Sequence, residues 1–378
     1  MYNILIAPDS FKGTLSASEV CDIIGQAFED TIKNIKITKL PAADGGEGLC
    51  SCLHKILGGE LKEASVRGVF GEKTQAEYLM LADNTAVIEM AACAGLPLAG
   101  ERKDPEKTVT FGVGELMLDA RANGAKSVLL GIGGSATNDF GIGMASALGW
   151  KFTDENGAEV YPCGGNLGKI ASITPPPNCF DLPVTVACDV ENPLYGENGA
   201  AYVFAPQKGA NEDAVRRLDE GLQSISRTVK KCLGIDVSAI KGSGAAGGMG
   251  GGAVAFLGAK LKKGIDIILD EADFEKKALE ADLIITGEGR LDSQSVNGKV
   301  ISGIAQRASA LGKKVVAVCG SKGDGAEEIR KLGVDELYFA SEEPKPFDEI
   351  IRTCRADLYN AALRAAKEIL TEGENNGK

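Results

Sequence analysis

The sequence predicts an α/β protein of two domains, in which a doubly wound parallel-sheet domain uses both ends of the chain and the middle forms an inserted second domain. Three observations lead to this fold class. The chain has 378 residues, which is long for a single hydrophobic core. Strand-like runs alternate with helix-like segments near both ends, an order typical of parallel sheets. Between residues 60 and 90 polar and apolar positions alternate instead, as in antiparallel strands.

The N-terminal segment begins with an apolar run at residues 2–7, which predicts a buried strand. A helix is expected after Ser16, because Ser16 and Glu19 have the spacing of a capping box. A second strand at 35–40 and a second helix from Leu49 follow. The two connecting loops, APDSFKGT and PAADGGEG, are expected at the same edge of the sheet, where parallel sheets bind their ligands.

The middle of the chain is expected to form a mixed sheet with helices. Its predicted elements are antiparallel strands within 60–90, a helix at 106–123, a strand at 127–131, a helix at 141–148, a strand at 183–189, a helix at 212–232 and a helix after the glycines of 242–252.

Near the C-terminus, three runs of buried type at 282–289, 314–320 and 336–340 return to the parallel-sheet pattern. We therefore expect one discontinuous domain made of residues 1–66 and 270–378. Residues 67–269 are expected to form the inserted mixed α/β domain, with the active site in the cleft between the two domains.

Composition excludes several classes of protein. A net charge of −12 disfavours nucleic acid as a partner, because such binding depends on Lys and Arg. The ten cysteines form no C-x-x-C pair, and the single histidine, His54, excludes both a His-rich zinc site and a Ser-His-Asp hydrolase. Scattered cysteines in apolar runs, with no leader and no long apolar stretch, predict a cytoplasmic protein that does not bind membranes.

Two glycine-rich stretches are candidates for anion binding. The stretch GSGAAGGMGGG (242–252) indicates a main chain that approaches an anion closely, and this interpretation is favoured over that of a flexible linker. GIGGSATND (131–139) lies between a predicted strand and a helix, where N–H groups can bind phosphate. It also satisfies G-x-G-x-x-A, the dinucleotide pattern, but Asn138 and Asp139 suit a phosphate bound to Mg²⁺ better than a bare pyrophosphate. A simple turn with an Asx cap stays open at each single position.

Charged residues follow several of the predicted strands. The carboxylates of Asp9, Asp44, Asp189, Glu288 and Asp292 are candidate Mg²⁺ ligands and bases, and Lys12, Lys208 and Arg290 are candidate cations beside them. Any one of these residues alone is equally typical of a helix cap, a turn or a solvated charge. The Walker A motif and the protein-kinase motifs are absent, so a phosphotransferase of this sequence needs another phosphate-binding loop.

Together the loops resemble the bacterial glycerate kinase family, of the D-glycerate 2-kinase type. The resemblance implies ATP-dependent phosphorylation of D-glycerate to 2-phosphoglycerate, Mg²⁺ dependence, and a two-domain architecture with a flavodoxin-like discontinuous domain. Phe140 departs from the family pattern, which commonly has glycine there, and so does VIS at 300–302, where proline is frequent. The matching stretches, in family order, are APDSFKGTLSA (7–17), PAADGGEG (41–48), GIGGSATND (131–139), ACDVENPLYGENGAAYVFAPQKGA (187–210), GSGAAGGMGGG (242–252) and TGEGRLDSQSVNGK (286–299).

On this resemblance we assign roles to individual residues. The base is Asp189, with Asp44 as the alternative, and Lys12 or Arg290 neutralises the transferring phosphoryl group or the glycerate carboxylate. Mg²⁺ is assigned to Asp139 or Asp44. ATP is assigned to Gly133, Gly134, Ser135, Thr137, Asn138, Gly247 and Gly248, and glycerate to Asp9, Ser10, Asn192, Lys208 and Asp292.

Several alternatives remain open at this point. The product can be 3-phosphoglycerate, because the two hydroxyls of glycerate are adjacent, or the acceptor can be another small hydroxy acid. An NAD(P)-dependent dehydrogenase and a non-catalytic ligand-binding protein are the alternatives from other classes. Monomer and homodimer are both compatible with the sequence.

Overall fold

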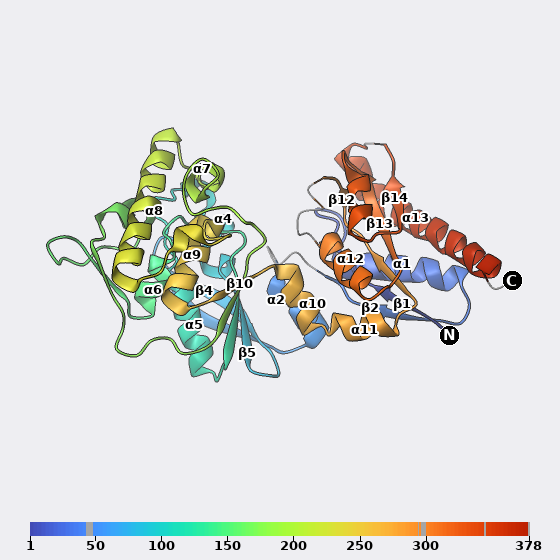
Figure 1. Cartoon of the computed structure of the whole chain (residues 1–378), viewed down its shortest axis with the longest axis horizontal. Helices are drawn as coiled ribbons and strands as arrows, with labels where there is room; N and C mark the ends of the chain where they lie inside the picture. The colour runs from blue at the N-terminus through green and yellow to red at the C-terminus, as the bar shows by residue number, and fades with distance from the viewer. Residues whose placement is uncertain (43–47, 294, 296–299, 344, 377–378) are drawn as a thin grey trace. The chain divides into compact units, whose positions relative to one another are not determined.

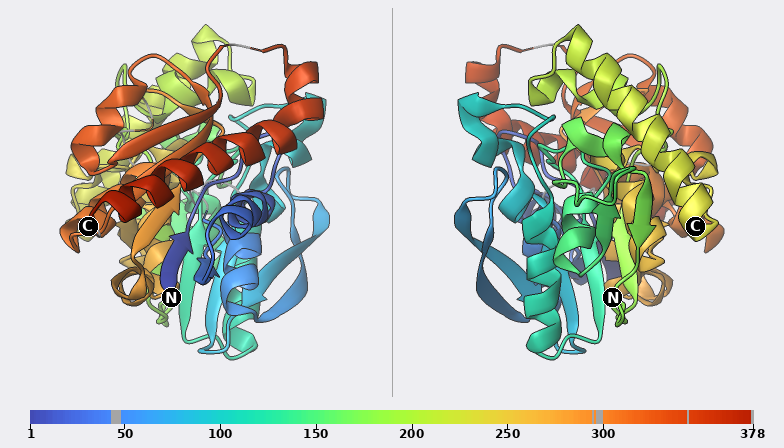
Figure 2. Two further views of the ribbon diagram at one scale, coloured as in Figure 1. Left: turned by 90° about the vertical axis from the view of Figure 1, so that its right-hand side faces the viewer. Right: turned by 90° about the vertical axis from the view of Figure 1, so that its left-hand side faces the viewer.

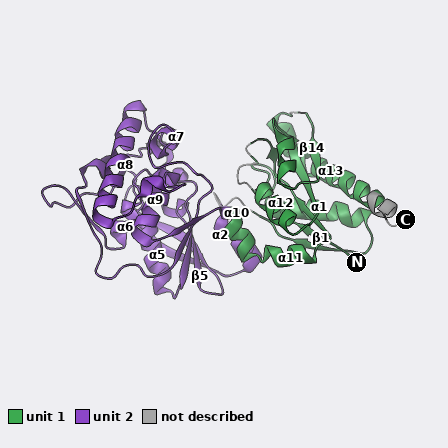
Figure 3. Cartoon of the chain, in the orientation of Figure 1, with its two compact units in different colours: residues 1–44, 265–378 green, residues 45–264 purple. Residues whose placement is uncertain are grey.

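The computed structural model describes residues 1–42, 48–293, 295, 300–343 and 345–376. The chain divides into two compact units, which are coloured separately in Figure 3. Unit 1 consists of residues 1–44 and 265–378, and unit 2 consists of residues 45–264. Unit 2 therefore begins earlier than the expected residue 67. The reason is that the N–H groups of Gly48 and Cys50 donate to the carboxylate of Glu89, which ties the following helix to the second sheet.

Unit 1 contains the elements of both chain ends (Figure 1). Short 3₁₀ helices are labelled η here and below. In chain order the elements are β1 (Tyr2–Ile6), α1 (Ala17–Thr31), β2 (Ile35–Lys39), α10 (Gly264–Glu271), α11 (Phe274–Glu280), β11 (Leu283–Thr286), β12 (Arg290–Leu291), α12 (Val300–Ala310), β13 (Val315–Lys322), η5 (Ala326–Leu332), β14 (Glu336–Ser341) and α13 (Phe347–Asn376).

The sheet of unit 1 is parallel and has the order β2-β1-β11-β13-β14, with the short β12 paired to the end of β13. Numbered along the unit, the five main strands follow the order 2-1-3-4-5 of flavodoxin-like sheets. This confirms the predicted fold class. The order reverses between β1 and β11, so the loops that follow these two strands lie side by side at the ligand-binding edge.

Both faces of this sheet are covered. Ile4 and Ile6 of β1 pack in one core with α1 and the long α13, which Figure 2 (left) shows in red. Leu5, whose side chain points the other way, is also fully buried, and α11 contacts β1. The helix α1 begins where it was predicted to begin. Ser16 Oγ accepts from the Glu19 N–H and the Glu19 carboxylate accepts from the Ser16 N–H, which is a complete capping box.

Unit 2 contains a mixed sheet and more helices than unit 1, among them the long α8 seen in Figure 2 (right). In chain order its elements are α2 (Leu49–Leu57), β3 (Glu60–Arg67), β4 (Lys73–Met80), β5 (Thr85–Glu89), α3 (Ala91–Ala94), α4 (Leu96–Ala99), η1 (Gly100–Arg102), α5 (Phe111–Ala122), β6 (Ser127–Gly131), α6 (Ile142–Ala147), β7 (Lys151–Thr153), η2 (Gly164–Lys169), β8 (Ser172–Thr174), β9 (Val184–Ala187), α7 (Ala200–Phe204), η3 (Pro206–Lys208), α8 (Glu212–Leu233), η4 (Val237–Ala239), α9 (Ala245–Leu257) and β10 (Lys260–Lys262).

The main sheet of unit 2 has the order β10-β9-β6-β5-β4-β3. The pairs β3/β4 and β4/β5 are antiparallel, and the pairs from β5 to β10 are parallel. The antiparallel region predicted at 60–90 and the mixed sheet are therefore confirmed. No helix in the described part of the chain has both the length and the apolar character needed to cross a membrane.

The glycine cluster lies in α9 and is packed against main chain. The helix is kinked where Ala246, Gly247 and Gly248 take left-handed backbone angles. A Cβ on Gly252 would lie only 1.9 Å from the carbonyl oxygen of Phe140. Glycine is therefore needed in this stretch so that α9 can approach the loop before α6, a reason for its presence that the sequence analysis did not foresee.

Phe140, the departure from the family pattern, belongs to the core of unit 2. It is fully buried, and its ring packs edge to face on Phe256 at 5.8 Å. Its φ of 55° lies in the left-handed region that favours glycine. The contact with Phe256 offsets the free-energy cost of the left-handed backbone at Phe140. A glycine at this position would not have that cost.

Candidate active site

Unit 1 contains a pocket of about 520 Å³ at the edge of its sheet. The predicted residues that line it are Asp9, Ser10, Lys12, Glu288, Arg290 and Asp292. The structure therefore brings together two loops that are far apart in the sequence.

Close main-chain contacts hold these two loops together. The Asp9 N–H donates to the Gly287 carbonyl at 2.8 Å. A Cβ on Gly289 would lie 3.1 Å from the Cα of Phe11, so the loops touch backbone to backbone. Asp9 is buried, whereas Lys12 is exposed and Arg290 pairs loosely with Asp292 at 3.7 Å. Lys12 and Arg290 are thus close to solvent, whereas the carboxylates of Asp9 and Glu288 are buried.

The same pocket also has apolar lining residues, which were not among the predicted site residues. It is lined by Ala340 at the end of β14 and by Phe347, Ile350 and Cys354 of α13. The last three recur at helical spacing, a pattern that in the sequence is indistinguishable from an ordinary buried helix face.

Unit 2 contains a smaller pocket of about 230 Å³. It is lined by predicted residues from three separate segments: Gly133, Gly134, Ser135, Asp189 and Lys208. Gly134 has a φ of 68°, and left-handed residues in such turns direct successive N–H groups toward a bound anion. The pocket thus combines a candidate anion-binding turn with one carboxylate and one ammonium group.

Lys208 is the unusual group of this pocket, because its side chain is buried without a carboxylate at ion-pair distance in the described structure. Its residue is 2 % exposed, and its Nζ donates to the Thr137 carbonyl at 2.6 Å and to Ser135 Oγ at 3.4 Å. Burial lowers the pKa of Lys208 to about 7, against a smaller opposing effect of Asp139. An anion in the pocket would therefore favour the charged form of Lys208.

Asp189 stands directly after β9 and is half-buried. Its Oδ1 accepts from the N–H of Gly264, the first residue of α10, at 2.8 Å. Its neighbour Cys188 also lines the pocket, but burial raises the pKa of that thiol to about 11. The thiol is therefore protonated at neutral pH and is a poor nucleophile, so Asp189 is the carboxylate of this pocket.

The remaining predicted residues of the 131–139 loop lie behind the pocket wall. Thr137 and Asn138 are fully buried, and neither amide atom of the Asn138 side chain has a hydrogen-bond partner within the described residues. Gly247 and Gly248 pack on this loop. A Cβ on Gly247 would lie 2.1 Å from the Thr137 carbonyl oxygen, so these glycines serve close packing.

Asp139 has a structural role in the described part of the chain, and the metal-binding role expected for it stays a prediction. Its Oδ2 accepts from the N–H of Thr110 at 2.9 Å, from Thr110 Oγ1 at 2.7 Å and from the Gly143 N–H at 3.3 Å, and its Oδ1 accepts from the Gly141 N–H. The carboxylate is fully buried, and burial raises its pKa. The four hydrogen bonds to this carboxylate join the start of α5 to the start of α6.

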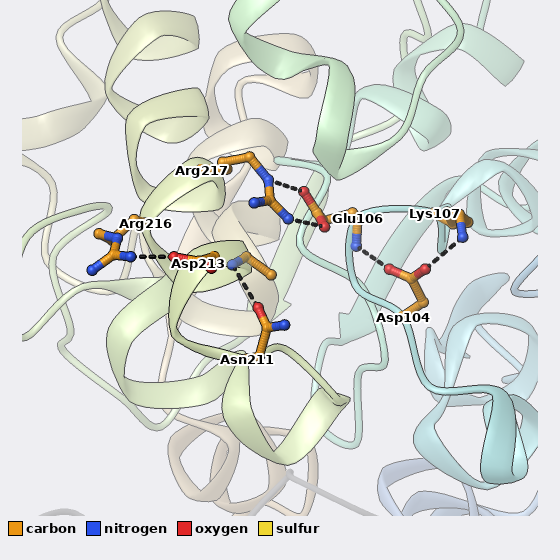
Figure 4. Close-up of polar contacts among 8 residues, drawn as sticks. Asp104, Glu106, Lys107, Asn211, Asp213, Arg216 and Arg217 are labelled. Carbon is orange, nitrogen blue, oxygen red and sulfur yellow. Dashed lines mark hydrogen bonds and ion pairs between the residues drawn. The ribbon is translucent and has the colours of Figure 1, made fainter.

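A polar network holds the segment that carries Lys208 (Figure 4). Arg217 of α8 donates twice to the Glu106 carboxylate, at 2.9 and 2.8 Å, and the Glu106 N–H donates to Asp104. Asn211 caps α8 by accepting from the Ala214 N–H. These contacts fix the start of α8 only a few residues after Lys208, so they position the turn that carries its ammonium group.

Asn192 is a further predicted residue that does not line either pocket. The Asn192 side chain donates to the Asn198 carbonyl, and the Asn192 carbonyl accepts from the Gly244 N–H, so this residue braces a loop. Asp44 lies outside the described residues. No group of three or more His, Cys, Asp or Glu side chains that could hold a metal ion occurs among residues with a described position.

Comparison with known proteins gives a consistent result. The model of the glycerate kinase family matches residues 4–370. The chain is 41% identical to glycerate 2-kinase of Escherichia coli K12, covering 99% of this chain and 100% of that one. It is also 41% identical to glycerate kinase of Halalkalibacterium halodurans, covering 97% and 98%. The crystal structure of "putative glycerate kinase 2" from Salmonella typhimurium LT2 superposes with a TM-score of 0.86 at 36% identity, over 99% of both chains.

The match extends over the two units, both pockets and nearly the whole chain, and the expected kinase activity agrees with the names of these relatives. The protein is therefore a kinase, and the chain belongs to the glycerate kinase family.

Proposed function

We propose that the protein transfers the γ-phosphoryl group of ATP to the 2-hydroxyl of D-glycerate, giving 2-phosphoglycerate and ADP. The observation that carries this proposal is that Asp189 and Lys208 line one small pocket beside the turn at Gly133–Ser135. The printed name of the E. coli relative, glycerate 2-kinase, supports the choice of hydroxyl.

The pocket of unit 2 suits a small anionic acceptor. Its volume of about 230 Å³ lies below the range of about 300–1,000 Å³ that is usual for drug-sized ligands. Lys208 and the N–H groups of the turn attract an anion, which is either the glycerate carboxylate or a phosphate. The sequence assigns Gly133, Gly134 and Ser135 to ATP phosphates and Lys208 to glycerate. Because these residues line one pocket, the two assignments describe alternative anions at the same site.

Asp189 is proposed as the general base. As the glycerate hydroxyl oxygen attacks the γ-phosphorus, its proton passes to the Asp189 carboxylate, and the bond to the ADP oxygen breaks. The hydrogen bond from the Gly264 N–H to Oδ1 holds the carboxylate in place. The same arrangement orients the carboxylate before the substrate arrives, which lowers the cost of positioning.

Mg²⁺ is proposed as the metal of this reaction, because Mg²⁺ in nucleotide sites needs only one or two carboxylates besides phosphate oxygens and water. In the described structure the carboxylates that fit are those of Asp9, Glu288 and Asp292, which line the pocket of unit 1. Asp44 stays a prediction. When bound, the ion would neutralise charge on the triphosphate. We also propose a cytoplasmic location, which agrees with ten cysteines that are all free thiols.

The test is ³¹P NMR of the purified protein with ATP, Mg²⁺ and D-glycerate, with L-glycerate as the control acceptor. We expect the resonance of 2-phosphoglycerate to grow as that of ATP declines. A 3-phosphoglycerate resonance would keep the kinase and overturn the position of transfer. ATP that stays intact in the presence of D-glycerate would contradict the proposed substrate.

A further inference from the structure

The pocket of unit 1 has two chemically different ends. At the edge of the sheet it is charged, with Asp9, Lys12 and Arg290. Between β14 and the start of α13, a region called the apolar end below, it is lined by Ala340, Phe347, Ile350 and Cys354, with the polar side chains of Ser341, Glu343, Lys345 and Asp357 in the same stretch. A ligand that fills the pocket therefore needs a charged part and a flat or bulky apolar part.

Phe347 is the most informative residue of the apolar end. It is 55% exposed although it is a large aromatic side chain that lines a pocket. A Cβ on Gly13 would lie 3.0 Å from its Cζ, so the ring stands directly beside the loop that carries Lys12. An exposed aromatic face next to a cationic loop is suited to a base that stacks on the ring while its phosphates extend toward the cation.

The polar residues around the apolar end can hydrogen-bond the edge of a base. Lys345 and Asp357 form an ion pair at 2.8 Å, and Asp357 also accepts from Thr353 Oγ1 at 2.7 Å. Ser341 lines the same end. A three-carbon hydroxy acid would leave this region unused, because glycerate has no aromatic or large apolar surface.

The size and position of the pocket agree with a nucleotide. Its volume of about 520 Å³ is more than twice the 230 Å³ of the pocket in unit 2. It lies beyond the carboxyl ends of β1 and β11, where the strand order of this flavodoxin-like sheet reverses, and such sheets bind nucleotides at that point.

We infer that the pocket of unit 1 binds the nucleoside of the phosphoryl donor, with its base stacked on Phe347 and its phosphates toward Lys12 and Arg290. This inference rests on the proposed ATP-dependent function, and it leaves the smaller pocket of unit 2 to glycerate. It reverses the expectation from the sequence, which assigned ATP to the glycine-rich loops of unit 2 and most of the glycerate contacts to unit 1.

The test compares Phe347→Ala with Ile351→Ala in the full-length protein. Ile351 is a matched control, because it is 51% exposed on the same helix and lies outside the residues that line the pocket. We expect Phe347→Ala to raise the KM for ATP about tenfold, the effect of losing one base–aromatic stack, with the KM for glycerate unchanged. Ile351→Ala should change neither value.

Direct titration of ADP by calorimetry separates this inference from the proposed function, because it needs no turnover. Phe347→Ala and a second variant, Ala340→Trp, which fills the apolar end, should both weaken ADP binding. If both bind ADP as the wild type does, or if Phe347→Ala raises the KM for glycerate instead, the inference is wrong even when glycerate is phosphorylated. If ADP binding weakens as expected but D-glycerate is not phosphorylated, the inference stands and the proposed substrate fails.

Discussion

The two pockets of this protein are built in different ways. The pocket of unit 1 lies at the ends of regular parallel strands, and its lysine, Lys12, stands on an exposed loop. The pocket of unit 2 also follows two parallel strands, β6 and β9, but it is completed by loops and helices packed main chain against main chain, and its lysine, Lys208, is buried. Residues of the same type thus have different surroundings in the two units: the Lys12 side chain is solvated, whereas the Lys208 side chain is desolvated.

In unit 1 the positions of the charged groups follow from the sheet. Parallel pairing of β1 with β11 brings the two loops together, whatever the details of their side chains. In unit 2 the pocket depends on close contacts such as that of α9 with the loop at Phe140. We therefore expect single substitutions to affect stability more strongly around the second pocket than around the first.

The largest effect is expected from Asp189→Asn, which would assign the chemistry to the pocket of unit 2. Loss of a general base typically lowers kcat about 100- to 10,000-fold, and the amide keeps the size of the side chain. Steady-state kinetics with D-glycerate and a thermal unfolding curve are the measurements. Asp181→Asn, at a side chain that is 78% exposed, is the control and should keep its kcat. A variant Asp189→Asn with normal folding and most of its kcat would remove Asp189 from this role.

The next effect is on stability and concerns Gly252. In Gly252→Ala the new Cβ would meet the Phe140 carbonyl oxygen at 1.9 Å, so α9 must shift. We expect a loss of about 3 kcal/mol in the free energy of unfolding, despite the higher helix propensity of alanine. Urea unfolding is the measurement, with Gly168→Ala as the control because a Cβ there meets no atom within 4 Å. Equal losses in the two variants would refute the close-packing explanation.

A pH effect should follow from the buried Lys208. Its pKa is lowered to about 7, whereas a lysine in the unfolded chain titrates near 10.4. Between these pH values the unfolded chain binds the proton and the folded chain does not, so raising the pH favours the folded state by up to about 1.4 kcal/mol per pH unit. Below pH 7 the lysine is protonated in both states, so the full cost of burying its charge lowers the free energy of unfolding.

The variant Lys208→Met should lack this rise in stability with pH. Urea unfolding at several pH values between 7 and 10 measures the rise. Parallel pH profiles of the two proteins would contradict a buried, neutral Lys208.

The smallest effect is expected in unit 1, at the cap of α1. Ser16→Ala removes the side-chain oxygen that accepts from Glu19 and should cost about 1 kcal/mol of unfolding free energy. Ser18→Ala, in the first turn of the same helix, is the control and should stay within about 0.5 kcal/mol of the wild type. Should Ser16→Ala cost as much as Gly252→Ala, the contrast between the two units would be lost.

Much of the fold was predictable because local patterns encode it. The capping box at Ser16 marked the start of α1, and the alternation at 60–90 marked the antiparallel strands. Strand ends marked Asp9 and Asp189 as pocket residues, since ligands gather at the carboxyl ends of parallel strands. The boundary of unit 2 was placed too late, because the contact of α2 with Glu89 leaves no trace in local periodicity.

The sequence by itself thus determined the α/β class, the positions of the main strands and helices, the family and several of the residues that line the two pockets. Only the tertiary structure decided what those residues contact. Thr110 donates two hydrogen bonds to Asp139 from 29 positions away, and the Lys208 ammonium donates to the Thr137 carbonyl across 71 positions. The glycines of α9 serve packing, and Phe347 joins a pocket that begins at β1. Periodicity and capping are properties of neighbouring residues, whereas burial and hydrogen-bond partners depend on which distant segments the fold brings together.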